Sequence, residues 1–186
     1  GQADPMAPVA NPSALQLDDG SIRLFFTNAG DGIASAISDD GITFSYETIR
    51  ISGPDAKDQG VQLGPSRIFR LQDGRVRLYV GSSESGISSF ISNDEGKTFT
   101  VEPGERITRT QANMDAIQKL SIVTLSDGSY RGYFGPAPQH GPTAVLADTG
   151  GPPDHWLLSA TSSDLLDWSI EPGVRIGPGS TVLTAS

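Results

Sequence analysis

The chain has 186 residues, and its length and hydrophobic content are those of a single domain with a real core. Its 22 glycines and 13 prolines are too frequent for a helical bundle and are typical of short strands joined by turns. The net charge of −9 argues against binding to nucleic acid or to an anionic membrane. No apolar run reaches the roughly 18 residues of a membrane span, so we expect no membrane insertion, and the lack of cysteine excludes disulfides and thiolate chemistry.

The N-terminal residues Gly1 to Pro5 are neither an initiator start nor a signal peptide. We therefore expect a trimmed chain whose targeting segment lies outside the sequence. We treat residues 1–186 as one partial domain.

An internal repeat is the strongest signal in the sequence. An Asp-Gly pair recurs with its glycine at 20, 74 and 128, which are 54 residues apart. Each pair lies between runs such as 21–27 in which apolar and polar residues alternate, the periodicity of a strand. Asp-Gly between two such runs predicts a tight hairpin turn.

Four strands fit into each of three copies, which cover residues 11–50, 63–107 and 117–177, with an insertion in 135–155 of the third. The strands are expected at about 12–18, 21–27, 32–38, 43–49, then 66–72, 75–82, 86–92, 98–104, and finally 119–126, 129–134, 156–163 and 167–172. A period near 50 residues with four strands is typical of a β-propeller blade. We therefore predict an all-β protein with about three blades of four antiparallel strands.

Three blades cannot close a ring, because propellers have about 4–8 blades. The missing blades, which would complete a five- or six-bladed ring, have three possible sources: another segment of the polypeptide, another chain, or a second copy in a homodimer. Capping of the last sheet by the N-terminal segment is a further alternative. We favour a longer polypeptide, because the repeat is cut at a place with no closing signal and residues 180–186 are suited to open the inner strand of a fourth blade.

The turn between the third and fourth strands carries a recognisable motif. Residues 92–99 read Ser-Asn-Asp-Glu-Gly-Lys-Thr-Phe and match the Asp-box (BNR-repeat) pattern Ser-x-Asp-x-Gly-x-Thr-aromatic. Residues 38–44 are one residue shorter, and residues 162–168 keep the Ser, the Asp and the aromatic residue. On these residues the chain resembles the sialidase-type and arabinanase- or xylosidase-type glycoside hydrolase propellers, over about 11–177.

The Asp box itself is expected to be structural, with Asp40 and Asp94 accepting hydrogen bonds from turn amides. In the families that the chain resembles, the box lies on the rim opposite the active site. The site is therefore expected on the other face, in loops 28–32, 50–63, 81–86, 105–118 and 135–155. Arginine recurs at positions 23, 77 and 131, which predicts an interblade ion pair or hydrogen bond.

Glycoside hydrolysis needs two carboxyl groups that flank the scissile bond. We predict Asp58, Asp115 and Glu84 as catalytic residues, because Asp58 and Asp115 precede the inner strands of two copies and Glu84 lies in a loop of the same face. Arabinanase-type enzymes carry Asp, Asp and Glu on successive blades. The resemblance places Asp4 at a comparable position, and we assign it to substrate binding; here the third carboxylate would be Asp rather than Glu.

Arg67, Arg109 and Lys119 are predicted to bind an anionic sugar, since guanidinium groups pair with carboxylates; pairing with neighbouring carboxylates is the alternative. His140 and His155 lie in or beside the insertion and are predicted to face a sugar. Their spacing matches no strong metal-ligand pattern, so we expect no metal and no cofactor.

The predicted function is hydrolysis of glycosidic bonds by a carbohydrate-active propeller that is secreted or periplasmic. The alternative is a non-catalytic Asp-box propeller that binds a glycan or a protein.

Overall fold

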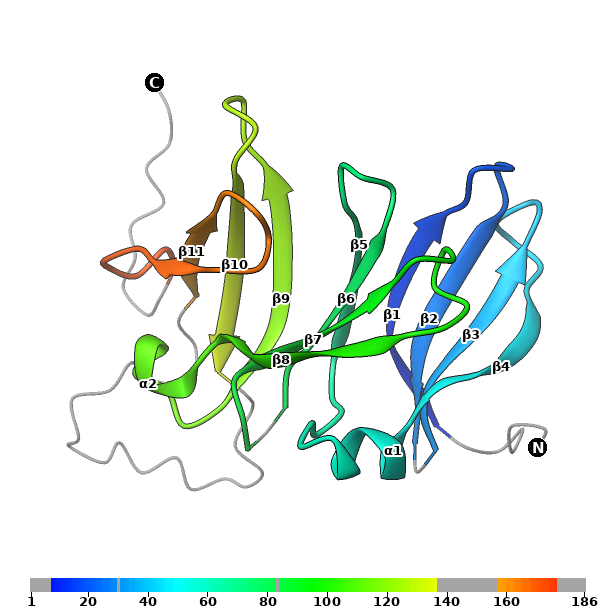
Figure 1. The fold of residues 1–186 in the computed structure, drawn as a ribbon, viewed down its shortest axis with the longest axis horizontal. Helices are drawn as coiled ribbons and strands as arrows, with labels where there is room; N and C mark the ends of the chain where they lie inside the picture. The colour runs from blue at the N-terminus through cyan, green and yellow to red at the C-terminus, as the bar shows by residue number, and fades with distance from the viewer. Residues whose placement is uncertain (1–7, 30, 83, 137–156, 177–186) are drawn as a thin grey trace.

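Three four-stranded antiparallel sheets make up the structure, a computed structural model that describes residues 8–29, 31–82, 84–136 and 157–176. The first sheet contains β1 (Val9–Gln16), β2 (Ile22–Asn28), β3 (Gly32–Ser38) and β4 (Ser45–Ser52) (Figure 1). The second contains β5 (Ser66–Arg70), β6 (Val76–Val80), β7 (Ile87–Ser92) and β8 (Thr100–Ile107). The third contains β9 (Ile117–Thr124), β10 (Tyr130–Pro136), β11 (Leu158–Ser162) and β12 (Ser169–Ile170). In each sheet the strands pair in chain order.

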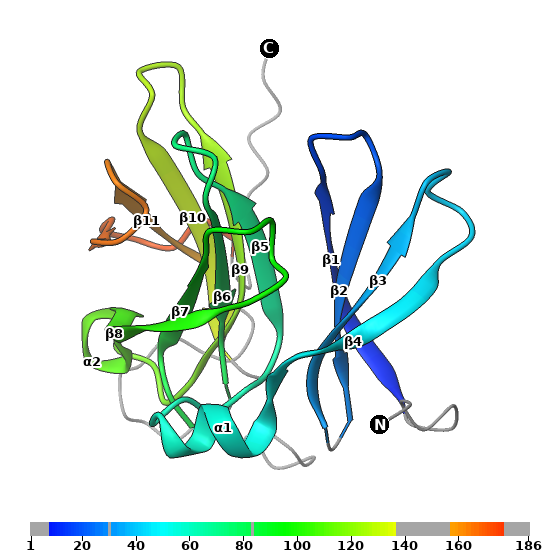
Figure 2. The same cartoon turned by 45° about the vertical axis from the view of Figure 1, so that its right-hand side comes forward.

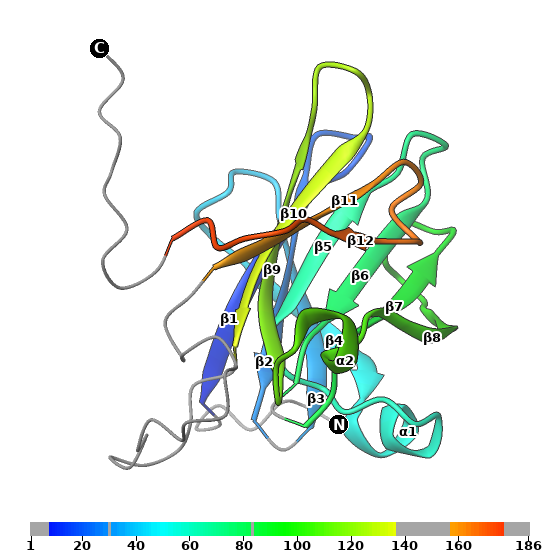
Figure 3. The same ribbon diagram turned by 90° about the vertical axis from the view of Figure 1, so that its left-hand side faces the viewer.

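The sheets are arranged around their first strands. β1 lies beside β5, and β5 lies beside β9, as Figures 1 and 3 show. The amide of Ile68 in β5 donates a hydrogen bond of 3.0 Å to Ser13 Oγ in β1, which joins two of these inner strands directly. Figure 2 shows the first and second sheets as separate layers. This is the arrangement of propeller blades, so the predicted all-β partial propeller is confirmed.

The Asp-Gly turns form the hairpins that the repeat predicts. Gly20, Gly74 and Gly128 have φ angles of +92°, +85° and +84°, a region that glycine enters without steric cost. In the second blade, Leu71 N donates to Arg75 O at 2.8 Å and Gly74 N donates back to Leu71 O at 3.1 Å. All three hairpins lie at one edge of the molecule, and helix α1 (Gly53–Asp58) lies at the other (Figure 1).

Two short helices occupy segments within 50–63 and 105–118, which the repeat pattern predicts to be loops. In α1, Ser52 caps the N-terminus by accepting a hydrogen bond from Asp55 N, and Pro54 fits the first turn. In α2 (Arg109–Ala112), Thr108 and Gln111 form a capping box. Helices this short show no 3.6-residue periodicity, which is why the pattern of apolar residues did not predict them.

The hydrophobic core lies between blades. One buried cluster joins Phe25 of the first blade to Leu78 and Phe90 of the second, and another joins Tyr79 of the second to Trp168 of the third. β6 is buried along its whole length because a neighbouring blade covers each of its faces.

The turns at 38–44, 92–99 and 162–168, named here the Ser–Asp turns, share one hydrogen-bond pattern. Asp40 Oδ1 accepts from the amides of Ile42 and Thr43, both at 2.8 Å, and Asp94 Oδ1 accepts from Thr98 N at 2.9 Å. These bonds confirm the structural role predicted for the two aspartates. The bonds from Thr43 and Ile42 lower the pKa of Asp40 to about 2.

The recurrent arginines form two kinds of contact. Within each blade, the guanidinium binds a glutamate of the fourth strand: Arg23 to Glu47 at 2.8 Å, Arg77 to Glu102 at 2.6 Å, and Arg131 to Glu171 at 2.9 Å. Between blades, the guanidinium groups of Arg23 and Arg77 donate to backbone carbonyls, as described below. The predicted interblade hydrogen bond is therefore present, whereas the ion pair lies inside one blade.

Candidate functional site

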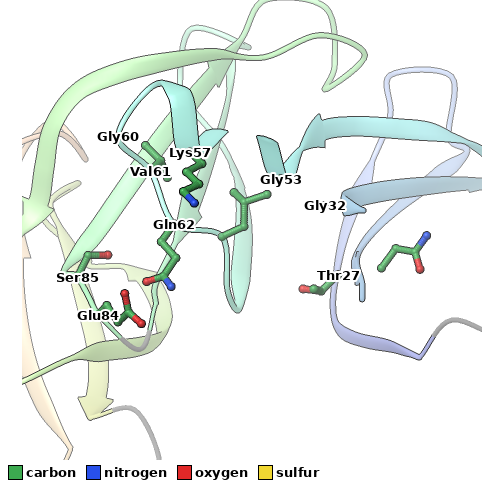
Figure 4. A pocket seen from close by; sticks show the side chains of 11 residues that line it. Thr27, Gly32, Gly53, Lys57, Gly60, Val61, Gln62, Glu84 and Ser85 are labelled. Atoms are coloured by element: carbon green, nitrogen blue, oxygen red, sulfur yellow. The ribbon is translucent and has the colours of Figure 1, made fainter. Parts of the chain in front are cut away.

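A cavity of about 650 Å³ lies between the first two blades, at the edge opposite the Asp-Gly hairpins. Its lining comes from the end of β2 and the start of β3, from α1 and the segment that follows it, and from the β6–β7 loop (Figure 4). These segments fall in the loops 28–32, 50–63 and 81–86, where the sequence analysis placed the site. The lining residues are Thr27, Asn28, Gly32, Gly53, Lys57, Gly60, Val61, Gln62, Leu63, Glu84 and Ser85.

Close backbone packing forms one side of the cavity. Gly32 has a φ of +136°, and a Cβ atom there would lie 2.1 Å from Ile51 O. Only glycine therefore lets the start of β3 approach the end of β4 so closely. Gly53 N donates to Asp31 O at 3.0 Å and ties the start of α1 to the β2–β3 loop.

The end of α1 sets the direction of the next segment. Gly60, with a φ of +77°, follows the helix, and Val61 N donates to Ala56 O at 2.8 Å. The side chain of Val61 is buried, which anchors the segment that carries Gln62. In Figure 4, Lys57 points from α1 toward Gln62, and both residues line the cavity together with Glu84.

A hydrogen-bonded turn holds Glu84 at the cavity. Ser82 Oγ accepts hydrogen bonds from Glu84 N at 3.1 Å and Ser85 N at 2.9 Å, and it lies 2.6 Å from Ser85 Oγ. Because Ser82 is buried, this local turn fixes the backbone while the Glu84 side chain stays exposed. Glu84 is the one carboxylate among the described lining residues.

Asn28 adds a buried amide to the cavity wall. Its Nδ2 atom donates to Asp31 Oδ2 at 3.1 Å, whereas no described residue donates to its Oδ1. A buried acceptor without a partner costs free energy, which a water molecule or a ligand hydroxyl would recover.

The groups on the cavity wall suit a polyhydroxylated ligand. An ammonium, a carboxylate, side-chain amides and hydroxyls are present together with the apolar side chains of Val61 and Leu63. Concave sites of this size, with apolar walls and a few polar groups, are typical for small ligands. Glu84 on this wall carries a carboxyl group of the kind that glycoside hydrolysis needs in pairs.

Of the predicted site residues, the structure places Glu84 on the cavity wall. Asp58 ends α1 and is exposed, directly after the wall residue Lys57. Asp115 is exposed between α2 and β9, and its carbonyl accepts a hydrogen bond of 3.1 Å from Arg109 Nη1. The catalytic roles of Asp58 and Asp115 stay predictions.

Of the predicted binding residues, Arg109 is exposed in α2, and the others lie on the inner strands or outside the described part. Arg67 is exposed in β5, and Lys119 is exposed in β9 at a left-handed position with a φ of +59°. Neither lines the cavity. Asp4, His140 and His155 lie outside the described residues.

Sequence reasoning missed three wall residues, Lys57, Gln62 and Asn28. Asn28 lies in a loop predicted to face the site, but no motif distinguishes it. Lys57 lies in α1, and Gln62 lies in the segment that follows this helix. Both reach the wall because of α1, which the sequence pattern does not predict.

In the ranges that the structure describes, no group of three or more His, Asp or Glu side chains is placed to hold a metal ion. In the same ranges, no helix is long and apolar enough to span a membrane.

No protein-family model matches the sequence, and the search of curated proteins gave no match. Solved structures do share the fold. A thermostable family-43 glycoside hydrolase superposes with a TM-score of 0.69 at 12% identity, over 96% of this chain and 56% of that one. A fructofuranosidase from Schwanniomyces occidentalis gives 0.66 at 13% identity, over 90% of this chain and 34% of that one.

An α-L-arabinofuranosidase from Clostridium thermocellum gives a TM-score of 0.61 at 18% identity, over 90% of this chain and 51% of that one. The chain thus spans a third to a little over half of each of these enzymes. At such low identity the likeness establishes the fold, and function has to be argued from the site.

Proposed function

We propose that the protein is a glycoside hydrolase and that the cavity between the first two blades is part of its substrate-binding site. One observation carries the proposal: Glu84 lies on the wall of a cavity rich in hydrogen-bonding groups, in a fold that the chain shares with glycoside hydrolases. Carbohydrate is the substrate class that such a wall suits.

The chemistry requires a second carboxyl group besides Glu84. In the mechanism we propose, one carboxyl group protonates the leaving oxygen and the other acts as base or nucleophile. Asp58 and Asp115 are our candidates for the second group, and Asp58 is the nearer in sequence to a wall residue. A separation of about 5–5.5 Å between the two carboxyl groups would give retention of configuration, and about 6.5–9.5 Å inversion.

Fold relatives and the resemblance of the sequence suggest the substrates to test. The fold relatives include a fructofuranosidase and an arabinofuranosidase, and the Ser–Asp turns resemble the Asp boxes of sialidase-type propellers. Arg67, Arg109 and Lys119 stay our candidates for binding an anionic sugar. Asp4, His140 and His155 stay candidates for substrate binding.

We also propose that the protein is secreted or periplasmic, because polymeric glycans are found outside the cytoplasm.

Hydrolysis of a panel of aryl arabinofuranosides, xylosides, fructosides and sialosides by the intact polypeptide tests the proposal. We expect turnover of at least one, and a loss of 100-fold or more in kcat for Glu84→Gln. Asp39→Asn, an exposed carboxylate in the first Ser–Asp turn, is the matched control and should leave kcat unchanged. No turnover, or full activity of Glu84→Gln, would contradict the proposal.

A glycan-binding protein without catalytic activity is the second candidate. It is favoured by the single carboxylate among the described wall residues, since binding does not need a carboxyl pair. Binding on a glycan array, lost in Gln62→Ala and without hydrolysis of the bound glycans, would distinguish this function from the first.

A further inference from the structure

The contact between the first and second blades is built on three residues of one face. In β1 and β2, Leu15, Arg23 and Phe25 lie on the face that meets the second Ser–Asp turn. Arg23 Nη1 donates to Glu95 O at 2.7 Å, and the rings of Phe25 and Phe99 meet edge to face at 5.8 Å. The turn thus inserts an aromatic ring and presents a carbonyl.

The contact between the second and third blades repeats this design. In the equivalent strands the residues are Phe69, Arg77 and Tyr79. Arg77 Nη1 donates to Asp164 O at 3.5 Å, and Tyr79 Oη donates to Leu165 O at 2.6 Å. The ring of Tyr79 meets that of Trp168 edge to face at 6.4 Å.

The third blade carries the same face without a cover among the described residues. Its equivalent residues are Val123, Arg131 and Tyr133, in register with the other two sets. Tyr133 is 36% exposed, whereas Phe25 and Tyr79 are 0% and 1% exposed. The Arg131 side chain is 33% exposed, against 4% for Arg23 and 5% for Arg77. No described carbonyl accepts a hydrogen bond from Nη1 of Arg131.

We infer that this face, defined by Val123, Arg131 and Tyr133, is the docking surface for a fourth blade of the same polypeptide, which presents a Ser–Asp turn to it. A carbonyl of the turn accepts from Arg131 Nη1, and the aromatic residue of the turn packs edge to face on Tyr133. The inference goes beyond the proposed function and does not depend on it, because a propeller without catalytic activity needs the same contact.

The fold relatives favour the same polypeptide as the source of this blade. The alignment that covers 96% of this chain covers 56% of the family-43 hydrolase, so nearly half of that enzyme lies outside the aligned part and belongs to the same chain. A second copy of this chain is the competing source, since its first Ser–Asp turn, with Ile42 at its tip, is also exposed.

Photo-crosslinking of the intact polypeptide tests the inference. A benzophenone amino acid replaces Tyr133, and the same substitution at Tyr46, which is exposed to a similar degree on the first blade, is the control. We expect position 133 to crosslink within one chain to a Ser-x-Asp turn that lies outside residues 1–186, while position 46 does not. A crosslink to residues 38–44 of a second copy, seen as a dimer on a denaturing gel, would overturn the assignment, and so would no specific crosslink.

Hydroxyl-radical footprinting of the unmodified polypeptide gives a second measurement that does not rely on a variant. Tyr133 should be oxidised as slowly as Tyr79, and at least fivefold more slowly than Tyr46. Oxidation of Tyr133 at the rate of Tyr46 would contradict a covered face.

Discussion

Arg23 and Glu47 show how one side-chain pair stabilises both a blade and its contact with the next. Glu47 accepts two hydrogen bonds from Arg23 and one of 2.8 Å from Ser35 Oγ, while Arg23 also donates to the second blade. Removing one member of a buried pair leaves the other charge uncompensated, which costs about 3–5 kcal/mol. The whole arrangement recurs in Arg77, which binds Glu102 and donates to Asp164 O, whereas for Arg131 only the pairing with Glu171 is present among the described residues.

Stability should therefore fall in acid. Burial raises the pKa of Glu47, but the hydrogen bonds from Arg23, Ser35 and Arg50 outweigh burial and lower the pKa from 4.5 to about 2. The stabilisation is complete above about pH 4.5 and is lost as the pH falls through 2. We expect Glu47→Gln to be less stable at pH 7 and to lose stability less steeply between pH 4.5 and 2. Urea unfolding at several pH values checks this. For the control variant Asp39→Asn, the free energy of unfolding should depend on pH as it does in the unaltered protein.

Tyr79 provides a test of the contact between the second and third blades. Burial raises its pKa, so the hydroxyl stays protonated and donates to Leu165 O. Tyr79→Phe leaves that carbonyl without its partner, and we expect a loss of about 1–2 kcal/mol in the free energy of unfolding. Tyr46→Phe, at an exposed position, should change it by less than about 0.5 kcal/mol. Equal effects of the two variants would contradict the interface.

At the scale of elements, the Ser–Asp turns act as the contact points between blades. Gly96 in the second turn has a φ of +80°, and a Cβ atom there would lie 2.5 Å from Phe25 Cζ. Gly74 in a hairpin has a φ of +85° with no atom within 4 Å of such a Cβ. The two glycines therefore share a left-handed backbone conformation and differ in packing.

The glycine pair predicts two different losses of stability. Gly74→Ala should cost about 1–2 kcal/mol, because alanine is strained in the left-handed region. Gly96→Ala should cost about 1–3 kcal/mol more, because the methyl group overlaps the Phe25 ring. Urea unfolding compares the two, and equal losses would show that the turn does not press against the first blade.

Much of the element order can be predicted from the sequence, because it rests on local chemistry. The Asp-Gly hairpins and the alternation along β2 and β6 depend on neighbouring residues, and both are present in the structure. The burial of Arg77 and Tyr79 cannot be predicted from neighbouring residues in the sequence. These two residues lie on a face of the second blade that the third blade covers, and their polar groups bond to it. The site loops and Glu84 were predicted from topology, whereas Lys57 and Gln62 depend on the short helix α1.

The described part of the chain forms an open series of three blades with unlike ends. The third blade exposes the face around Tyr133, and the first exposes its Ser–Asp turn. Each end therefore carries one half of the contact that is complete between neighbouring blades. Heterologous contacts of this kind close into a ring when the rotation per unit allows it. The cavity between the first two blades does not involve the open ends.

The cavity makes a prediction about binding that is separate from catalysis. Lys57 belongs to an exposed helix face, so Lys57→Ala should leave the fold intact and remove one donor from the cavity. We expect the affinity for a bound oligosaccharide to fall about 5- to 30-fold, which corresponds to about 1–2 kcal/mol. Isothermal titration checks this, and Arg75→Ala in a hairpin at the opposite edge is the control.

The most direct test is a crystal structure of the intact polypeptide with an oligosaccharide that it binds or cleaves. We expect a sugar ring in the cavity between the first two blades, within hydrogen-bond distance of Glu84 and of Lys57 or Gln62. A sugar held at the edge of the Asp-Gly hairpins, or an empty cavity at saturating ligand, would contradict it.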